Sequence, residues 1–236
     1  TGPYYDIFTL PTAGEAGGGV SGTEAYYSFD YGNIHFVCLD SASSTRAPQS
    51  PMLTWLESDL TATDKDWIIA FWHHPPYSKG NHDSDLEGRL IDMRENALPV
   101  LEAAGVDLVL SGHSHSYERS YLIDGHYGDS ESLLQEMILD AGNGRIGGNG
   151  PYLKPPGKNP HEGAVYAVAG SSGQTSQGSL DHPVMFYNLR TLGSMVMDIH
   201  GSRLEAGFID SEGVLRDFFA IDKNEGPSNV RMWGLY

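Results

Sequence analysis

Val106-Asp107-Leu108-Val109-Leu110-Ser111-Gly112-His113-Ser114-His115 is the stretch from which the fold of this chain can be inferred. Its first six residues form an apolar run that predicts a buried strand. His113 and His115 follow directly, and side chains two residues apart project from the same side of an extended backbone. Neutral imidazole is a common metal ligand, so the pair can bind one metal ion or two adjacent ones. A single His-x-His pair is a weak signal, and a metal site requires further ligands nearby.

The residues before this stretch alternate between strand and helix patterns. Strand, helix, strand, helix and strand are expected at residues 34–39, 51–63, 67–72, 89–104 and 106–111. Such alternation implies a parallel sheet with right-handed crossovers. In these sheets ligands bind beyond the carboxyl ends of the strands. His73 and His113 each follow one of these strands, so both belong to a candidate site.

The strand patterns in the remainder of the chain predict antiparallel pairing. Residues 26–29 and 34–39, separated by turn residues, predict an antiparallel pair. After residue 119, strands are expected at 120–124, 164–169, 195–200, 203–209 and 214–221, the last three as a meander. Residues 141–163 and 170–183 are expected to be flexible loops at the rim of a site. Residues 142–147 satisfy the G-x-G-x-x-G spacing but lack the flanking strand and helix of a dinucleotide fingerprint. Gly170-Ser171-Ser172-Gly173 lacks the G-x-S-x-G spacing of a nucleophile elbow.

The net charge of the chain disfavours some classes of binding partner. The chain has 14 basic and 31 acidic residues, a net charge of −17. Nucleic acids and anionic membrane surfaces are therefore disfavoured as partners, because both attract basic surfaces. No apolar run approaches the length of a membrane span. The expected partner is a small molecule.

Two motifs contain the candidate metal-binding histidines of the chain. They are His73-x-Pro75-x-Tyr77 and Gly112-His113-x-His115-x-Tyr117-Glu118-Arg119. A single histidine at a strand end is usually structural, but three at the ends of two parallel strands favour metal binding. Imidazole ligands indicate zinc, iron, manganese or a similar transition ion, with oxygen ligands completing the coordination.

These motifs resemble the C-terminal part of calcineurin-like metallophosphoesterases, most closely the purple acid phosphatase branch and its bacterial relatives. The resemblance implies that His73 and His113 share one metal ion and that His115 holds its neighbour. It implies two Fe, Zn or Mn ions in a complete site. His82 resembles a histidine that the family carries on the substrate side, where it contacts phosphate or acts as a general acid. His74 either reaches the phosphate or packs beside Tyr77.

The resemblance also implies the fold class. We expect an α/β fold with α+β elements, forming part of a two-sheet β-sandwich flanked by helices, with a C-terminal antiparallel meander. Residues 1–225 correspond to the C-terminal part of a metallophosphoesterase catalytic domain, and 226–236 form an unassigned tail. The match is specific over most of residues 1–120 and looser over residues 164–221.

One departure from the family concerns the missing carboxylates. The family supplies an Asp, a bridging Asp and an Asn upstream of the histidines, and residues 1–72 contain no such pattern. Gly80-Asn81-His82-Asp83 looks like the Asn motif but follows His73 instead of preceding it. The chain is therefore expected to carry the histidine half of a two-metal site and to bind at most one ion alone.

The leading hypothesis is a metal-dependent phosphoester hydrolase, a phosphomonoesterase or phosphodiesterase. In this hypothesis metal ions bind the phosphate oxygens and activate water while a histidine protonates the leaving alcohol. The alternative is a non-catalytic metal-binding or interaction domain. A further possibility is a catalytic half that requires a separate N-terminal polypeptide, or a piece of a longer protein. Half a sandwich would expose an apolar sheet face, so oligomerisation or unusual loop coverage is expected. The resemblance suggests an extracellular or periplasmic protein, although no signal peptide is visible in this chain.

Overall fold

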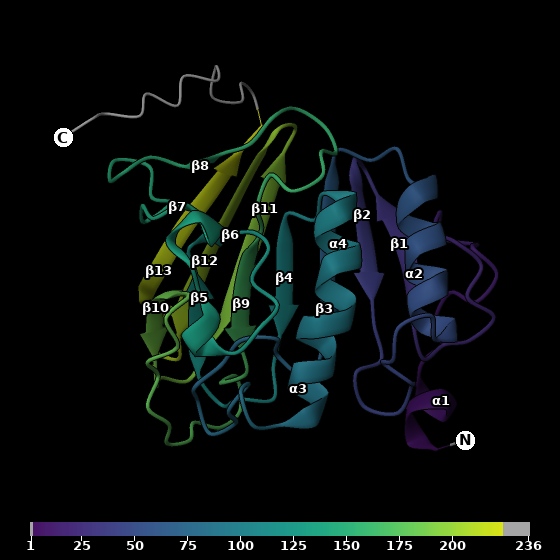
Figure 1. The fold of residues 1–236 in the computed structure, drawn as a ribbon, viewed down its shortest axis with the longest axis horizontal. Coiled ribbons are helices and arrows are strands. Elements are labelled where there is room, and N and C mark those ends of the chain that lie inside the picture. Colours follow the sequence, from purple (N-terminus) through teal and green to yellow (C-terminus); the bar gives the residue numbers. More distant parts are fainter. Residues whose placement is uncertain (1, 224–236) are drawn as a thin grey trace.

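Residues 2–223 are described by a computed structural model, in which strands form a seven-stranded, a four-stranded and a two-stranded sheet. The seven-stranded sheet has the order β1 (Tyr27–Tyr31), β2 (Ile34–Cys38), β3 (Trp67–Trp72), β4 (Leu108–Ser111), β9 (Val165–Ala169), β5 (Tyr117–Ser120) and β10 (Met185–Leu189). Strands β2, β3, β4 and β9 are parallel to one another, and β1 pairs with β2 in the antiparallel sense. The predicted hairpin and parallel sheet are therefore confirmed (Figure 1).

Helices connect the parallel strands as predicted. They are α2 (Pro51–Ala62), α3 (Gly88–Asp92), η1 (Met93–Ala97) and α4 (Leu98–Ala104), with a short α1 (Pro3–Ile7) near the N-terminus. The Ser50 hydroxyl accepts a hydrogen bond from the Leu53 backbone N–H, and Gly105 ends α4 in the left-handed conformation at φ 84°. The single helix expected at 89–104 contains a π-helical segment, η1. Pro99 follows it and has no N–H for the preceding turn, which favours such a change of helical register.

The C-terminal strands form the second sheet. It has the order β11 (Gly193–His200), β12 (Arg203–Asp210), β13 (Leu215–Asp222) and β8 (Tyr152–Leu153). The predicted meander is confirmed. The strand expected at 120–124 is wrong in its bounds, since β5 begins at Tyr117 and β6 (Leu122–Ile123) pairs separately with β7 (Ile138–Asp140). Strands β7, β8 and β10 were not predicted, and the turns η2 (Ser130–Ser132) and η3 (Gln135–Met137) complete the described elements.

Both faces of the seven-stranded sheet are covered. Along β3, the side chains of Ile68, Ala70 and Trp72 pack in a core with the helices. Trp67 and Ile69 point to the opposite face, into a second core shared with the four-stranded sheet. The continuous apolar run of β3 follows from burial on both sides. Figure 1 shows α4 in front of β3, and the fold is the expected sandwich with helices on one side.

A buried ion pair joins the two sheets. Asp217 of β13 accepts hydrogen bonds from the Arg119 Nε at 2.5 Å and from the Tyr117 hydroxyl at 2.9 Å, both on β5. Burial alone would raise the pKa of Asp217, but hydrogen bonds and charge from Arg119 outweigh burial and lower that pKa. Tyr117 and Arg119, which follow the histidine motif directly, therefore fix its position against the second sheet.

The outer face of the four-stranded sheet carries exposed apolar side chains. Val196 and Leu215 are 55% and 56% exposed, and Leu215 lies over Gly207, which has no side chain to cover it. These two side chains are therefore exposed on the outer face of the sheet, and the half-sandwich hypothesis stays a prediction. None of the helices within residues 2–223 has the length and apolar character needed to span a membrane.

Candidate functional site

The carboxyl ends of β3 and β4 bring two predicted ligands together. Trp72 and Ser111 are register partners at the last position of each strand, and the Gly112 N–H donates to the His73 carbonyl at 3.1 Å. The Nε2 of His73 then lies 3.0 Å from the Nδ1 of His113. The backbone of His113 has φ 62°, a conformation that costs free energy in a residue with a side chain. Such strain is concentrated at functional sites, and here it occurs at a predicted ligand.

His74 completes a group of three imidazoles. Ring nitrogens of His73, His74 and His113 lie within 4.8 Å of one another. The buried His74 has its Nδ1 2.9 Å from the Ser41 hydroxyl oxygen, and that oxygen also accepts from the His74 backbone N–H. Burial, and then the charge of neighbouring histidines, lowers the pKa of all three rings, to about 4 for His74. The rings are therefore held neutral, the form that binds metal ions.

His82 and Glu87 flank the same histidine on its other side. The ring of His82 stacks on that of His113 with centroids 3.6 Å apart. One Glu87 oxygen lies 2.8 Å from the His82 Nδ1, and the other lies 3.6 Å from the His113 Nε2. Sequence reasoning identified His82 but missed Glu87, because no periodic pattern marks a carboxylate in this loop.

His115 lies apart from this group. Among the residues the structure describes, the close groups of potential ligands that contain His73 or His113 do not include it. Its backbone N–H donates to the Asn81 side-chain oxygen at 2.7 Å, and its Nδ1 lies 3.2 Å from the Ser176 hydroxyl. That His115 holds a neighbouring ion stays a prediction. Asn81, set aside as an out-of-order motif residue, holds the backbone of a predicted ligand.

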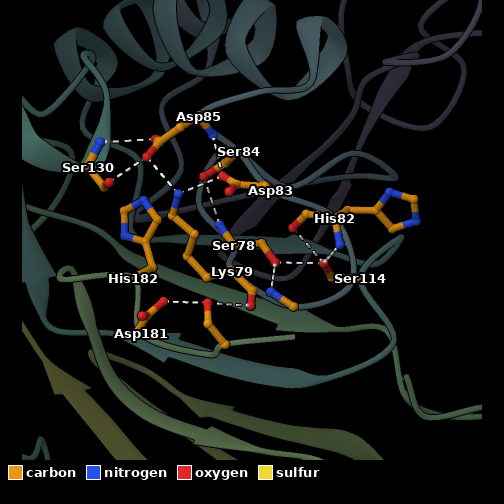
Figure 2. A network of polar contacts seen from close by, with 12 residues as sticks. Ser78, Lys79, His82, Asp83, Ser84, Asp85, Ser114, Ser130, Asp181 and His182 are labelled. Carbon is orange, nitrogen blue, oxygen red and sulfur yellow. Dashed lines mark hydrogen bonds and ion pairs between the residues drawn. The ribbon is translucent and has the colours of Figure 1, made fainter. Parts of the chain in front are cut away.

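A polar network fixes the loop that carries His82 (Figure 2). The hydroxyls of Ser78 and Ser114 are 2.6 Å apart, and the His82 N–H donates to the Ser114 oxygen at 3.3 Å. Lys79 forms ion pairs of 2.7 Å with both Asp83 and Asp85. The loop between β3 and α3 is therefore bound to the histidine loop after β4.

The side chain of Glu118 is hydrogen-bonded to both of these loops. Its carboxylate accepts hydrogen bonds from the Ser78 hydroxyl at 2.7 Å, the Ser116 hydroxyl at 2.8 Å and the Lys79 N–H at 3.1 Å. Burial raises the pKa of Glu118. This carboxylate braces the histidine loop through serine hydroxyls and backbone. The hydrogen bonds it makes within the described chain include none to an imidazole.

The donor set fits a transition metal ion. Two nitrogens bound to one ion at about 2.0–2.1 Å lie roughly 2.9–3.4 Å apart for bond angles between 90° and 109°. The His73 and His113 nitrogens, at 3.0 Å, already have this separation. The imidazoles of His73, His74 and His113 form a nitrogen donor set, which suits zinc, iron or manganese better than calcium or magnesium, and Glu87 belongs to a separate group with His82 and His113.

Sequence comparison relates the chain to known phosphatases. Residues 2–117 match the family model described as calcineurin-like phosphoesterase. Purple acid phosphatase 18 of Arabidopsis thaliana is 32% identical over 129 residues, which cover 52% of this chain and 28% of that protein. Purple acid phosphatase 13 of the same plant is 34% identical over 173 residues, covering 71% of this chain and 30% of that protein. The chain thus spans less than a third of the length of these curated relatives.

Solved structures agree in fold. The purple acid phosphatase PPD1 from seeds of yellow lupin (Lupinus luteus) superposes with a TM-score of 0.66 at 18% identity, covering 93% of this chain and 35% of that one. GAP50 of Plasmodium, described as the anchor in the inner membrane complex, gives a TM-score of 0.54 at 15% identity, covering 86% and 54%. The resemblance inferred from the histidine motifs is confirmed: residues 2–117 belong to the calcineurin-like phosphoesterase family, in its purple acid phosphatase-like branch.

Proposed function

We propose that this chain supplies the histidine half of the metal centre of a phosphoester hydrolase. The 3.0 Å approach of the His73 and His113 ring nitrogens, at the carboxyl ends of adjacent parallel strands, carries the proposal. Family membership over residues 2–117 supports it. Residues 1–225 would then form the C-terminal part of the catalytic domain, with 226–236 outside it; that tail lies beyond the described residues.

Each histidine has a proposed role. His73 and His113 hold one metal ion, and His115 holds its neighbour. When bound, such ions polarise the phosphoryl oxygens and lower the pKa of water. The chain's own contribution is to keep the imidazoles neutral by burial and to fix their directions through the loops after β3 and β4.

His82 is the proposed general acid toward the leaving alcohol. Its Nδ1 is hydrogen-bonded to Glu87, and its ring is held parallel to that of His113, which leaves Nε2 to reach a substrate. His74 is the second proposed catalytic residue. With its pKa near 4 it stays neutral at pH 7, so its role is to contact the phosphate and support His113 rather than to deliver a proton.

The proposed cofactors are Fe, Zn or Mn ions, and the proposed substrate is a small phosphomonoester or phosphodiester. A complete site takes two ions. Residues 2–72 supply none of the described close ligand groups, so we expect this chain alone to bind at most one ion. Its purple acid phosphatase relatives motivate the proposal of an exported protein.

The test combines metal content with turnover. We expect the purified chain to bind about one Zn²⁺ or Mn²⁺ and the His113→Ala variant to lose this ion. Any hydrolysis of an aryl phosphate should fall at least 100-fold in that variant. His200→Ala, at the exposed end of β11, is the matched control and should retain both properties. Equal metal binding by wild type and His113→Ala would rule out the proposed site.

A non-catalytic metal-binding domain is the second candidate. It is motivated by the ligand group of His73, His74 and His113, which consists of imidazoles without a carboxylate. Stoichiometric metal binding that depends on His73 and His113, with no hydrolysis above buffer, would select this candidate. Addition of a separately expressed polypeptide carrying the missing motifs should then restore turnover if the chain is a catalytic half.

A further inference from the structure

A buried histidine of β2, outside the candidate metal site, lies between two carboxylates. His35 is 1% exposed. Its Nδ1 lies 2.8 Å from an oxygen of Asp30 on β1, and its Nε2 lies 2.8 Å from an oxygen of Asp59 on α2. The two strands lie at one edge of the seven-stranded sheet, with α2 beside them (Figure 1). Three elements of the fold therefore meet at one imidazole.

The two carboxylates determine the protonation state of His35. An ionised carboxylate only accepts hydrogen bonds, and a neutral imidazole has a single N–H. A neutral ring would therefore turn an unprotonated nitrogen toward one of the acids, whereas the imidazolium donates to both. Asp59 also accepts the Ser28 hydroxyl at 2.7 Å. Burial alone would raise the pKa of Asp59, but the hydrogen bonds from His35 and Ser28 outweigh burial and lower that pKa, so the acid is ionised.

The glycine-rich segment of residues 16–19 packs on the same two acids. The Gly19 N–H donates to Asp59 at 2.6 Å, through the oxygen that does not face the imidazole. A Cβ atom at Gly19 would lie 2.8 Å from this oxygen, and one at Gly17 would lie 2.9 Å from the Asp30 side chain. The glycines thus allow a close approach that side chains would prevent, and the segment is held by the acids that flank the ring.

The charges around His35 balance only while the ring is protonated. The charged groups that contact this cluster in the described structure are Asp30, Asp59 and Lys65, whose Nζ lies 3.5 Å from the second Asp30 oxygen. Burial alone would lower the pKa of His35, but hydrogen bonds and charge from Asp59 and Asp30 outweigh burial and raise that pKa. Loss of the proton would leave the buried Asp59 carboxylate without a counter-charge, which is strongly unfavourable.

We infer that His35 is a buried imidazolium whose proton holds residues 16–19 against β1 and α2, so that deprotonation releases this segment. A histidine whose pKa is raised on folding contributes stability that is fully present below pH 6.5. This contribution is lost as the pH rises through the pKa of the folded state. The segment should therefore be held at neutral pH and released in alkaline solution. The inference is independent of the proposed metal centre, because it uses none of the site histidines.

The experiment follows the proton and the segment in the same 236-residue chain. The ring ¹⁵N shifts of His35 and the backbone ¹⁵N shift of Gly19, read in carbon-detected spectra, are measured from pH 6 to pH 10.5. Asp30→Asn keeps an oxygen acceptor for the ring but removes the charge, and Asp64→Asn, at an exposed position, is the matched control. Urea unfolding at pH 7.5 and pH 9 gives the equilibrium constants, above the range in which Glu102, with a pKa of about 7, mainly titrates.

We expect two protonated ring nitrogens on His35 at pH 7.5 in wild type and Asp64→Asn, and a Gly19 shift that changes as one proton is lost. The unfolding equilibrium constant should rise by up to about 10-fold per pH unit between pH 7.5 and the pKa of His35. In Asp30→Asn, His35 should lose its proton at least one pH unit lower.

Three results in wild type would overturn the inference, so it can be tested even if Asp30→Asn does not fold. They are a neutral His35 at pH 7.5, a His35 that stays protonated to pH 10.5, and a Gly19 shift that does not follow the His35 titration. A pH at which His35 loses its proton that is the same in Asp30→Asn as in wild type would contradict it as well.

Discussion

At the scale of single residues, His113 combines a predicted ligand with an unfavourable backbone. A φ of 62° is accessible to glycine at little cost, whereas a residue with a Cβ atom loses roughly 1 kcal/mol there. Position 113 carries a histidine, whereas the neighbouring Gly112 and Ser114 have no imidazole side chain. A strained residue retained next to His73 and Glu87 is what a functional role would produce.

Because of this strain, two substitutions of His113 should differ in their free energy of unfolding. We expect His113→Gly to be more stable than His113→Ala by about 1 kcal/mol, because only glycine relieves the positive φ. Urea unfolding of both variants measures the difference. The corresponding pair at His115, whose φ is not positive, is the control and should favour alanine or show no difference. A more stable His113→Ala would show that the backbone is not strained.

Two histidines outside the site predict sensitivity to acid. His126 and His182 are buried, and in the described structure both His126 ring nitrogens and the His182 Nε2 have no hydrogen-bond partner. Burial lowers the pKa of His126 to about 4 and that of His182 to about 3. The unfolded chain, with a histidine pKa near 6.5, binds these protons first. Stability is therefore fully present above pH 6.5 and decreases as the pH falls toward 4.

For His182 alone the loss between pH 7.5 and pH 5 should be about 2 kcal/mol, because 1.4 kcal/mol corresponds to each unit of pKa difference that is titrated. Urea unfolding at the two pH values measures it. His182→Asn retains an acceptor for the Val184 N–H and should remove this part of the pH dependence. An unchanged slope in the variant would assign the acid sensitivity to other groups.

At the scale of elements, the strands and helices were easier to predict than the loops between them. Apolar runs and a 3.6-residue period identified β3, β4, α2 and the helical segment before Gly105. Strand β10 and the packing of the 170–183 loop were not predicted, because their partners are the distant β5 and the histidine loops. Local sequence carries no signal for a contact whose partner is 60 residues away.

The packing of the 170–183 loop gives an element-scale prediction. Gly170→Ala should destabilise the chain by about 1–3 kcal/mol, because the new methyl group would overlap the Ser114 carbonyl and displace the histidine loop. Metal affinity should decrease with it. Gly173→Ala is the matched control, since a Cβ at Gly173 meets nothing within 4 Å. Thermal unfolding compares the two variants. Equal melting temperatures would show that the loop accommodates the methyl group without a loss of stability.

At the scale of the whole molecule, the outer face of the four-stranded sheet carries apolar side chains that stay exposed within residues 2–223. Val196 and Leu215 are more than half exposed there, and Phe218 of β13 lies close to Gly207 on the same face. Exposed apolar patches on sheets favour association. We propose that this face is covered by a second copy or by a separate N-terminal half.

Light scattering tests the first possibility. We expect the isolated chain to self-associate at tens of micromolar, and the Val196→Lys/Leu215→Lys double variant to be monomeric, because two charges on one face oppose its burial. Lysines at the exposed Glu131 and Glu136, away from this face, serve as the charge control. A wild-type chain that is monomeric at 100 µM would leave the separate half as the remaining proposal.

The sequence by itself determined the parallel order of β2, β3 and β4 and the position of His73 and His113 at adjacent strand ends. It could do so because periodicity and strand order are local properties, and they fix which residues emerge at one edge of a sheet. Only the tertiary structure brought Glu87 to His82, Ser41 to His74 and Ser176 to His115. Those contacts depend on how irregular loops close over long separations, and no repeat in the chain encodes that geometry.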